Sequence, residues 1–285
     1  MQGFDNIIEI KGLIKEYPGF TLGPYDLSVP AGCITGFIGE NGAGKSTTIN
    51  AMLGLIKKDA GSIRLFGRED YLNDADVFDD IGVVLDSCGL HEAFTASQSQ
   101  KILRGMYKRW SDDSFEDYLR RFRIDPKKKI KDYSQGMRRK LDLAIALSHD
   151  AKLLILDEPT SGLDPVVRDE LLDVFLEFIQ RDDRAIFLSS HILSDLEKAS
   201  DTVAFLHGGK LIFHEPKDTL KERFLVVKCG EDDLKSFPKS AVRGVRKNRF
   251  GVEALVERTA VPAGYTVDRA SIEDIMLFYV KEEMQ

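Results

Sequence analysis

Residues 39–46 read Gly-Glu-Asn-Gly-Ala-Gly-Lys-Ser and match the phosphate-binding loop pattern G-x-x-x-x-G-K-[ST] at every fixed position. Small residues in such a loop let backbone N–H groups turn toward phosphate oxygens, and the helix that follows adds its partial positive charge. Lys45 is expected to reach the β- and γ-phosphates, and the Ser46 hydroxyl is expected to hold Mg²⁺. The pattern therefore predicts a binding site for a nucleoside triphosphate.

Two acidic residues, Asp157 and Glu158, close a second apolar segment at residues 153–156. Asp157 can hold Mg²⁺ directly or through water, and Glu158 can orient and polarise an attacking water. A lone Asp-Glu pair often does nothing but end a strand. Because this pair comes after a phosphate-binding loop and an apolar run, it favours hydrolysis of the triphosphate over binding alone.

A short polar segment at residues 133–137, Tyr-Ser-Gln-Gly-Met, opens a predicted helix. Ser134 is the expected N-cap, and the free N–H groups of that helix end would attract an anion. Taken alone this signal is weak, because many helices begin with serine.

These residues need a sheet to position them, and the hydrophobic pattern predicts a parallel one in an α/β fold. Apolar segments precede the phosphate-binding loop (residues 34–38) and the acidic pair, and a third occupies residues 185–189, as expected of strands buried on both faces. Asp164 and Pro165 resemble an N-cap followed by a proline in the first helical turn. Residues 94–149 are mostly helical in pattern, and residues 202–213 predict a hairpin.

The pattern changes near Lys221. Residues 225–228 and 252–256 are short β-like segments, and Ser271 with Asp274 predicts a capping box for a last helix. We therefore expect two parts, a nucleotide-binding domain at residues 1–220 and a small C-terminal domain at residues 221–285.

The chain of 285 residues has a net charge of −7 and a pI near 5.4, which argues against nucleic acid as the main partner. Between Arg120 and Lys140, however, the sequence holds ten Lys or Arg and only two Asp. A solvated, partly helical face explains such a run. A docking surface near anionic lipid or a protein partner is the alternative.

Cys33, Cys88 and Cys229 are far apart and form no C-x-x-C pair, which predicts a reducing compartment with neither a disulfide framework nor a zinc site. Four histidines show no spacing typical of metal ligands, and we expect them at surface or hairpin positions. They are His91, His149, His207 and His214. No signal peptide is visible, and no apolar run reaches the roughly 18 residues that cross a bilayer. We expect a soluble, cytosolic protein, in which any membrane role must come through another chain.

Taken in order, the motifs resemble those of the nucleotide-binding subunit of ATP-binding cassette (ABC) transporters, over residues 5–215. The segment Ser134, Gln135, Gly136 resembles the signature motif Leu-Ser-Gly-Gly-Gln, with Tyr133 for the leucine and Met137 for the final glutamine. Residues 153–158 resemble Walker B with its catalytic glutamate, and residues 161–164 resemble the D-loop.

Two single residues extend the resemblance. His191, just past a buried strand, resembles the switch histidine, and Tyr17 resembles the aromatic residue that stacks on adenine. The family fold that this implies is an α/β P-loop NTPase core with an antiparallel β-subdomain, a helical subdomain at about residues 88–150 and a small α+β C-terminal extension. The implied catalytic residues are Lys45, Glu158 and His191. The implied nucleotide contacts are Tyr17, Gly39, Glu40, Asn41, Gly42, Ala43, Gly44, Lys45, Ser46, Thr47, Ser134, Gln135, Gly136 and Asp164.

One position departs from the family pattern. Members usually carry a glutamine at the end of the strand that corresponds to residues 81–85, where it reaches Mg²⁺ and the attacking water, and this chain has Asp86. An aspartate is shorter and charged, so direct metal contact and altered coupling to a membrane partner are both open. The expected metal ligands are Ser46, Asp157 and Asp86.

In this family the signature serine faces the γ-phosphate bound by the opposite subunit. The resemblance therefore implies a dimer, of identical or different cassettes, that encloses two ATP molecules with Mg²⁺. Lys45, His191 and Ser134 of the partner subunit would neutralise charge on the transferring phosphoryl group, while Glu158 positions water. Loss of the γ-phosphate would then loosen the dimer.

The resemblance also implies a separate transmembrane permease subunit as partner, no nucleic acid, and a place at the cytoplasmic face of the cell membrane. The short C-terminal part is similar to that of bacterial exporters of peptides, antibiotics or lipids. An ABC-type ATPase of DNA repair or of the ribosome is the alternative, although the chain carries no coiled-coil insertion and one cassette. A P-loop kinase would not explain the signature segment, the D-loop and His191 in this order.

Overall fold

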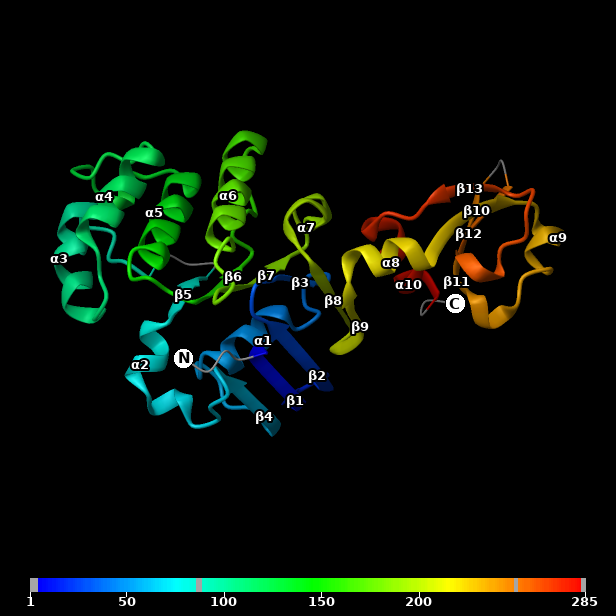
Figure 1. Ribbon diagram of the computed structural model, residues 1–285, viewed down its shortest axis with the longest axis horizontal. Coiled ribbons are helices and arrows are strands. Elements are labelled where there is room, and N and C mark those ends of the chain that lie inside the picture. The colour runs from blue at the N-terminus through cyan, green and yellow to red at the C-terminus, as the bar shows by residue number, and fades with distance from the viewer. Residues whose placement is uncertain (1–4, 86–88, 249–250, 283–285) are drawn as a thin grey trace.

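The computed structural model describes residues 5–85, 89–248 and 251–282 and places them in three sheets with surrounding helices (Figure 1). The central sheet has the strand order β5-β6-β7-β3-β8-β9. Its strands are β3 (Ile34–Ile38), β5 (Ile81–Val84), β6 (Leu153–Asp157), β7 (Ala185–Ser190), β8 (Thr202–His207) and β9 (Lys210–Pro216). Neighbouring strands pair in parallel, except β8 and β9, which form the predicted hairpin.

The phosphate-binding loop, the two acids and His191 lie at the carboxyl ends of three neighbouring strands of the central sheet. Strand β7 lies between β3 and β6, with Ile34 opposite Ile186 and Leu153 opposite Ala185. All residues of these three strands are buried, as the continuous apolar runs predicted. Because the strands are parallel, the segments that follow their carboxyl ends lie side by side, as in other open α/β sheets.

The second sheet is antiparallel, has the order β2-β1-β4 and confirms the expected β-subdomain. Its strands are β1 (Asn6–Tyr17), β2 (Phe20–Pro30) and β4 (Ala60–Leu65). Register shifts along strand β1 interrupt the alternation of inward and outward residues. Leu22 and Tyr25 of β2 share a hydrophobic cluster with Ile49 of α1 (Lys45–Met52) and Phe187 of β7, so β2 helps to cover α1.

Two helices follow the carboxyl ends of β6 and β7, namely α6 (Pro165–Phe178) and α7 (Leu193–Ala199). Helix α6 begins as predicted: the Asp164 carboxylate accepts hydrogen bonds from the N–H groups of Val166 at 3.0 Å and Val167 at 3.1 Å. Two short segments, η1 (Tyr71–Asn73) and α2 (Ala75–Asp79), lead into β5.

A helical subdomain lies at one end of the molecule (Figure 1). It comprises α3 (Ala96–Met106), α4 (Asp112–Arg121), η2 (Ile130–Asp132) and α5 (Gln135–Leu147), in agreement with the helical pattern. Phe115 and Leu119 of α4 pack with Leu141 of α5 in the main hydrophobic cluster. The surface or hairpin position expected for His149 is wrong. Its side chain is fully buried and stacks on Tyr107 at 4.1 Å, because it fills the space where α5 meets β5.

The C-terminal residues form a four-stranded sheet of order β11-β12-β10-β13 at the other end of the molecule (Figure 1). Its elements are α8 (Lys217–Arg223), β10 (Phe224–Cys229), α9 (Glu231–Leu234), η3 (Lys239–Ala241), β11 (Val242–Asn248), β12 (Gly251–Glu257), η4 (Arg258–Ala260), β13 (Thr266–Arg269) and α10 (Ile272–Glu282). The Ser271 hydroxyl accepts from the Asp274 N–H at 3.0 Å, and the Asp274 carboxylate accepts from the Ser271 N–H at 3.1 Å. The predicted capping box is therefore confirmed.

None of the helices in the described part of the chain is both long and apolar enough to span a membrane. Cys33 and Cys229 are free thiols, and Cys88 lies outside the described residues. Within those residues no group of three or more His, Cys, Asp or Glu side chains is arranged to hold a metal ion.

Candidate nucleotide-binding and hydrolysis site

The phosphate-binding loop connects β3 to α1 in a conformation that requires glycine. Gly42 and Gly44 have φ values of +85° and +112°, in the region that glycine adopts without strain. A Cβ on Gly39 would lie 2.6 Å from the Leu206 carbonyl oxygen, and one on Gly44 would lie 2.5 Å from Leu22 Cδ1. Gly44 caps α1 without a side chain, so the first N–H groups of the helix stay available to an anion.

The remaining loop residues differ in exposure. Glu40, Asn41, Gly42 and Ser46 are exposed, Thr47 is half-buried and Ala43 is buried. The exposed residues form an open rim, while Ala43 anchors the loop in the core. A cradle of glycines with an exposed hydroxyl at the start of α1 fits a bound polyphosphate.

Lys45 lies across the loop and is 6% exposed. Its ammonium donates to the carbonyl oxygens of Gly39 at 2.7 Å and Glu40 at 3.3 Å, and lies 3.2 Å from Glu158 Oε1. The charge of Lys45 is thus balanced by groups that a phosphate could replace. Phosphate oxygens in the loop would compete with the Glu158 carboxylate for this ammonium.

The two acids at the end of β6 are held by Ser189 of β7. The Ser189 hydroxyl donates to Asp157 Oδ1 at 2.6 Å and accepts from the Glu158 N–H at 3.1 Å. Glu158 has a φ of +51°, which costs a residue other than glycine about 1–2 kcal/mol. The bonds from its N–H to β7 hold this conformation, which directs the carboxylate away from the strand axis and toward Lys45 and His191.

The Glu158 carboxylate joins the three predicted catalytic residues. Glu158 Oε1 faces Lys45, and Glu158 Oε2 lies 2.6 Å from His191 Nδ1 and 3.3 Å from the His191 backbone N–H, which donates to it. Because a carboxylate only accepts, His191 Nδ1 carries the proton. His191 is 42% exposed, so its other ring nitrogen is accessible to a ligand.

Of the three expected metal ligands, the structure describes Ser46 and Asp157. Asp86 lies outside the described residues. Asp157 is buried at the end of β6, and Ser46 is exposed in the first turn of α1. A hydroxyl and one carboxylate fit Mg²⁺, which is commonly bound through one or two carboxylates with substrate phosphates and water. These oxygens suit a magnesium ion that arrives with a nucleotide and not one that is bound alone.

Tyr17 ends β1 next to the turn into β2, and its ring is 41% exposed, with Lys15 Nζ 5.5 Å from the ring centroid. The neighbouring Phe20 is half-buried and packs toward Gly44 of the loop. Tyr17 is thus an exposed aromatic residue with the Lys15 ammonium over its ring, and its stacking on adenine stays a prediction.

The signature segment is placed apart from the phosphate-binding loop of the same chain. Ser134 caps α5 by accepting from the Met137 N–H at 3.2 Å, and the Ser134 and Gln135 side chains are exposed. Gly136 faces Leu163, and the Gln135 amide approaches Gly162 of the D-loop. Among the described residues, no hydrogen bond or ion pair links this segment to residues 39–47. Asp164 acts locally as the cap of α6.

Sequence reasoning missed three supporting residues. Ser189 carries the hydrogen bonds just described, and its only signal was a polar residue at the end of a buried strand. Tyr25 Oη lies 2.5 Å from Thr48 Oγ1 of α1, and His207 Nδ1 lies 3.1 Å from Glu40 Oε1 of the loop. These pairs join segments that are far apart in the sequence, so no local pattern predicts them.

Comparison with known proteins agrees with this geometry. The family model described as ABC transporter matches residues 22–161. The bacitracin transport ATP-binding protein BcrA of Bacillus licheniformis is 38% identical over 201 residues, which are 70% of this chain and 65% of that protein. The lantibiotic transport ATP-binding protein SrtF of Streptococcus pyogenes is 34% identical over 74% of this chain and 92% of its own length.

A solved structure of the ATP-binding subunit of an ABC transporter superposes with a TM-score of 0.69 at 28% identity, covering 75% of this chain and 92% of that one. This chain thus spans slightly less than two thirds of BcrA and nearly all of SrtF. The curated relatives are transport proteins, so the alternative of a DNA-repair or ribosomal ATPase is not favoured. The chain belongs to the ATP-binding subunits of ABC transporters, the components of these systems that hydrolyse ATP.

Proposed function

We propose that this chain powers the export of a peptide antibiotic or a related amphiphile through a separate membrane subunit. The names of BcrA and SrtF, which refer to bacitracin and lantibiotic transport, support this substrate class. The observation that carries the ATPase chemistry is the Glu158 carboxylate between Lys45 and His191. A protein that only binds nucleotide has no need for this arrangement.

In the proposed site the loop N–H groups and Lys45 bind the phosphates of ATP, and Tyr17 stacks on adenine. Ser46 and Asp157 would hold Mg²⁺, which when bound neutralises charge on the phosphate oxygens. Once phosphates replace Glu158 as the partner of Lys45, the Glu158 carboxylate can orient water, while its bond to His191 holds it in place. His191 presents its second ring nitrogen to the γ-phosphate.

The proposed active unit is a dimer. In the described residues, no hydrogen bond or ion pair joins Ser134, Gln135 and Gly136 to the phosphate-binding loop of their own chain. The Ser134 side chain is exposed, and so is Gly162 of the neighbouring D-loop. We infer that they complete the site of a second ATP-binding subunit, identical or different. Two ATP molecules would hold the dimer closed, and hydrolysis would open it.

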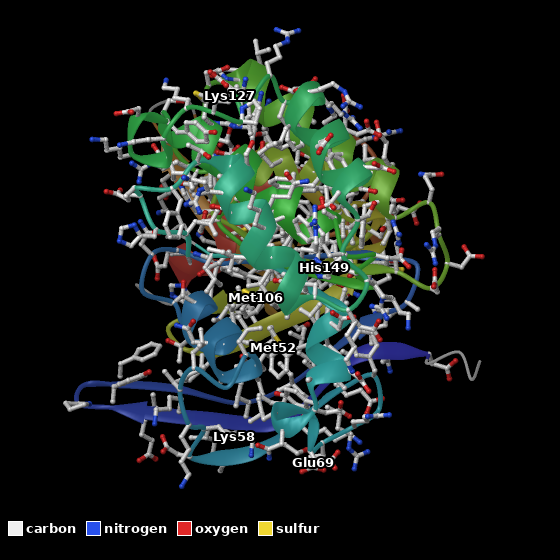
Figure 2. The ribbon with its side chains drawn as sticks, turned by 90° about the vertical axis from the view of Figure 1, so that its left-hand side faces the viewer. Met52, Lys58, Glu69, Met106, Lys127 and His149 are labelled. Carbon is white, nitrogen blue, oxygen red and sulfur yellow. The ribbon has the colours of Figure 1, made fainter. Side chains whose placement is uncertain are left out.

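Exposed apolar side chains support a membrane partner beside the helical subdomain. Ile102 and Met106, both on α3, are 49% and 68% exposed. Figure 2 shows Met106 on the face turned toward the viewer, where the helical subdomain meets the core. We propose that the transmembrane permease subunit contacts this face, which would hold the chain at the cytoplasmic side of the membrane.

Glu158→Gln tests the hydrolysis site. Loss of the carboxylate charge should reduce ATP turnover below detection, because the water loses its orienting group, while ATP binding persists. ATP hydrolysis, nucleotide binding and the dimer fraction in size-exclusion chromatography are measured together. The variant should accumulate as an ATP-bound dimer. Glu273→Gln on the exposed face of α10 is the control. Normal turnover by Glu158→Gln would refute the assignment.

The transport role is tested by purifying the chain from its native cell. Recovery of a protein with membrane-spanning helices, whose complex shows ATP hydrolysis stimulated by bacitracin, supports the proposed substrate class. Recovery of ribosomes or DNA in its place would favour the non-transport alternative.

A further inference from the structure

A segment of five exposed cations lies in the helical subdomain, away from the catalytic residues. We call residues 123–131 the basic loop; its cations are Arg123, Lys127, Lys128, Lys129 and Lys131. None of the five lies within ion-pair distance of a carboxylate in the described part of the chain. Neighbouring arginines do have partners: Arg121 pairs with Glu177, and Arg138 pairs with Glu92 at 2.7 Å.

The backbone of the basic loop is fixed by the fold. Ile130 is fully buried, and its N–H donates to the Phe94 carbonyl oxygen at 2.9 Å, while the Lys131 N–H donates to Glu92 O at 3.0 Å. The buried Tyr133 donates its hydroxyl to Asp125 O at 2.8 Å. An ordered backbone with apolar anchors thus presents the lysines to solvent, so their exposure is not a product of a frayed segment.

The charge of the basic loop contrasts with the rest of the protein. The only carboxylates between Arg123 and Asp132 are Asp125 and Asp132, so the segment is positive in a chain whose net charge is −7. Clustering of like charges raises the free energy of the free protein unless an anionic surface offsets it. The composition of the basic loop is therefore suited to binding an anionic surface.

We propose that the basic loop is a contact surface for anionic phospholipid headgroups. Four of the five cations are lysines, whose flexible point charges suit mobile phosphates, whereas a fixed carboxylate partner would favour the rigid arginine fork. Clusters of several lysines and arginines are attracted to the negative surface of membranes that contain anionic lipids. The inference rests on the proposed function only in that a permease brings the chain to the membrane.

Sedimentation of the full chain with vesicles tests this surface. Vesicles of phosphatidylcholine with phosphatidylglycerol are compared with vesicles of phosphatidylcholine alone, at low and high salt. Lys127→Glu combined with Lys128→Glu should weaken binding to the anionic vesicles by about tenfold or more. The matched control is Lys57→Glu combined with Lys58→Glu, an equal change of charge. Figure 2 shows Lys127 near the top of the view and Lys58 near the bottom.

The control variant should bind like the wild type, and added salt should release the wild type, since exposed charges are screened. Retention of a fluorescent ATP analogue by all variants shows that they are folded. Equal binding by the basic-loop variant and the control would overturn the proposal. So would equal binding to both vesicle types, or retention on an oligonucleotide without any binding to anionic vesicles. None of these measurements depends on ATP turnover. If the proposed transport function is wrong, the result of the vesicle assay therefore still stands.

Discussion

At the scale of single residues, the candidate site depends on the backbone of Glu158 as much as on its carboxylate. A left-handed residue at the end of β6 directs the side chain to Lys45 on one side and His191 on the other. Ser189 stabilises this geometry from the neighbouring strand. We therefore regard Ser189 as a positioning residue for the two acids.

Ser189→Ala should lower kcat by about tenfold or more with little change in KM for ATP. Asp157 loses its hydroxyl donor, and the Glu158 N–H keeps only its bond to the Ser189 carbonyl oxygen, while the phosphate-binding loop stays intact. Steady-state kinetics and equilibrium ATP binding separate the two effects. An equal loss in both parameters would instead indicate general damage to the fold, and unchanged kcat would exclude a positioning role.

At the scale of elements, strand β2 supports the phosphate-binding loop through a buried chain of hydroxyls. Thr48 Oγ1 donates to the Gly44 carbonyl oxygen at 3.0 Å, which uses its single proton. The Tyr25 hydroxyl, 2.5 Å away, is therefore the donor to Thr48. This connects the β-subdomain to the first turn of α1.

Thr48→Val keeps the side-chain shape but leaves the buried Tyr25 hydroxyl without its acceptor, and we expect about 1–3 kcal/mol of destabilisation. Denaturant unfolding measures this loss, and titration with ATP should show weaker binding as well. Thr48→Ser retains the hydroxyl and serves as the matched control. If valine and serine behave alike, the hydroxyl chain contributes nothing to the loop.

At the scale of the whole molecule, the C-terminal sheet is a sheet of its own, but it packs against the rest of the protein. Its four strands pair only with each other in the described residues, yet Leu255, Ile275 and Phe278 belong to the same hydrophobic cluster as the central sheet. Tyr279 of α10 contacts Phe213 of β9 with ring centroids 5.7 Å apart. The division at residues 220 and 221 falls inside α8 and stays a prediction.

Stability should decrease in mildly acidic solution because of the buried His149 and the half-buried His214. Burial lowers the pKa of His149 and of His214, while an unfolded histidine titrates near about 6.5. As the pH falls through that value, the unfolded chain binds protons that the folded chain does not, so the free energy of unfolding decreases. Urea midpoints at about pH 7.5 and pH 5.5 measure the effect, on either side of the histidine value.

His149→Gln should reduce that pH dependence, and the exposed His91→Gln should leave it unchanged. An identical dependence in wild type and His149→Gln would show that this buried ring does not contribute. Asp195 acts in the opposite direction at lower pH, because burial raises its pKa.

Much of the site could be predicted from the sequence, because most of its functional residues belong to short contiguous motifs. The loop at residues 39–46, the acids after β6, the Asp164 cap and the last helix each depend on neighbours within a few positions, and the structure places them as expected. The ligand roles of these residues stay proposals. Asp86, which departs from the family pattern, lies outside the described residues.

Local sequence patterns alone determined the phosphate-binding loop, the buried parallel strands and the membership in an ATPase family. Only the tertiary structure decided that Ser189 holds both acids, that Tyr25 reaches Thr48, that His149 is buried and that Lys45 contacts Glu158. Each of these contacts joins residues from different elements, often more than 20 positions apart. Sequence spacing carries information on neighbours along the chain, whereas such contacts depend on strand order and on the packing of one layer against another.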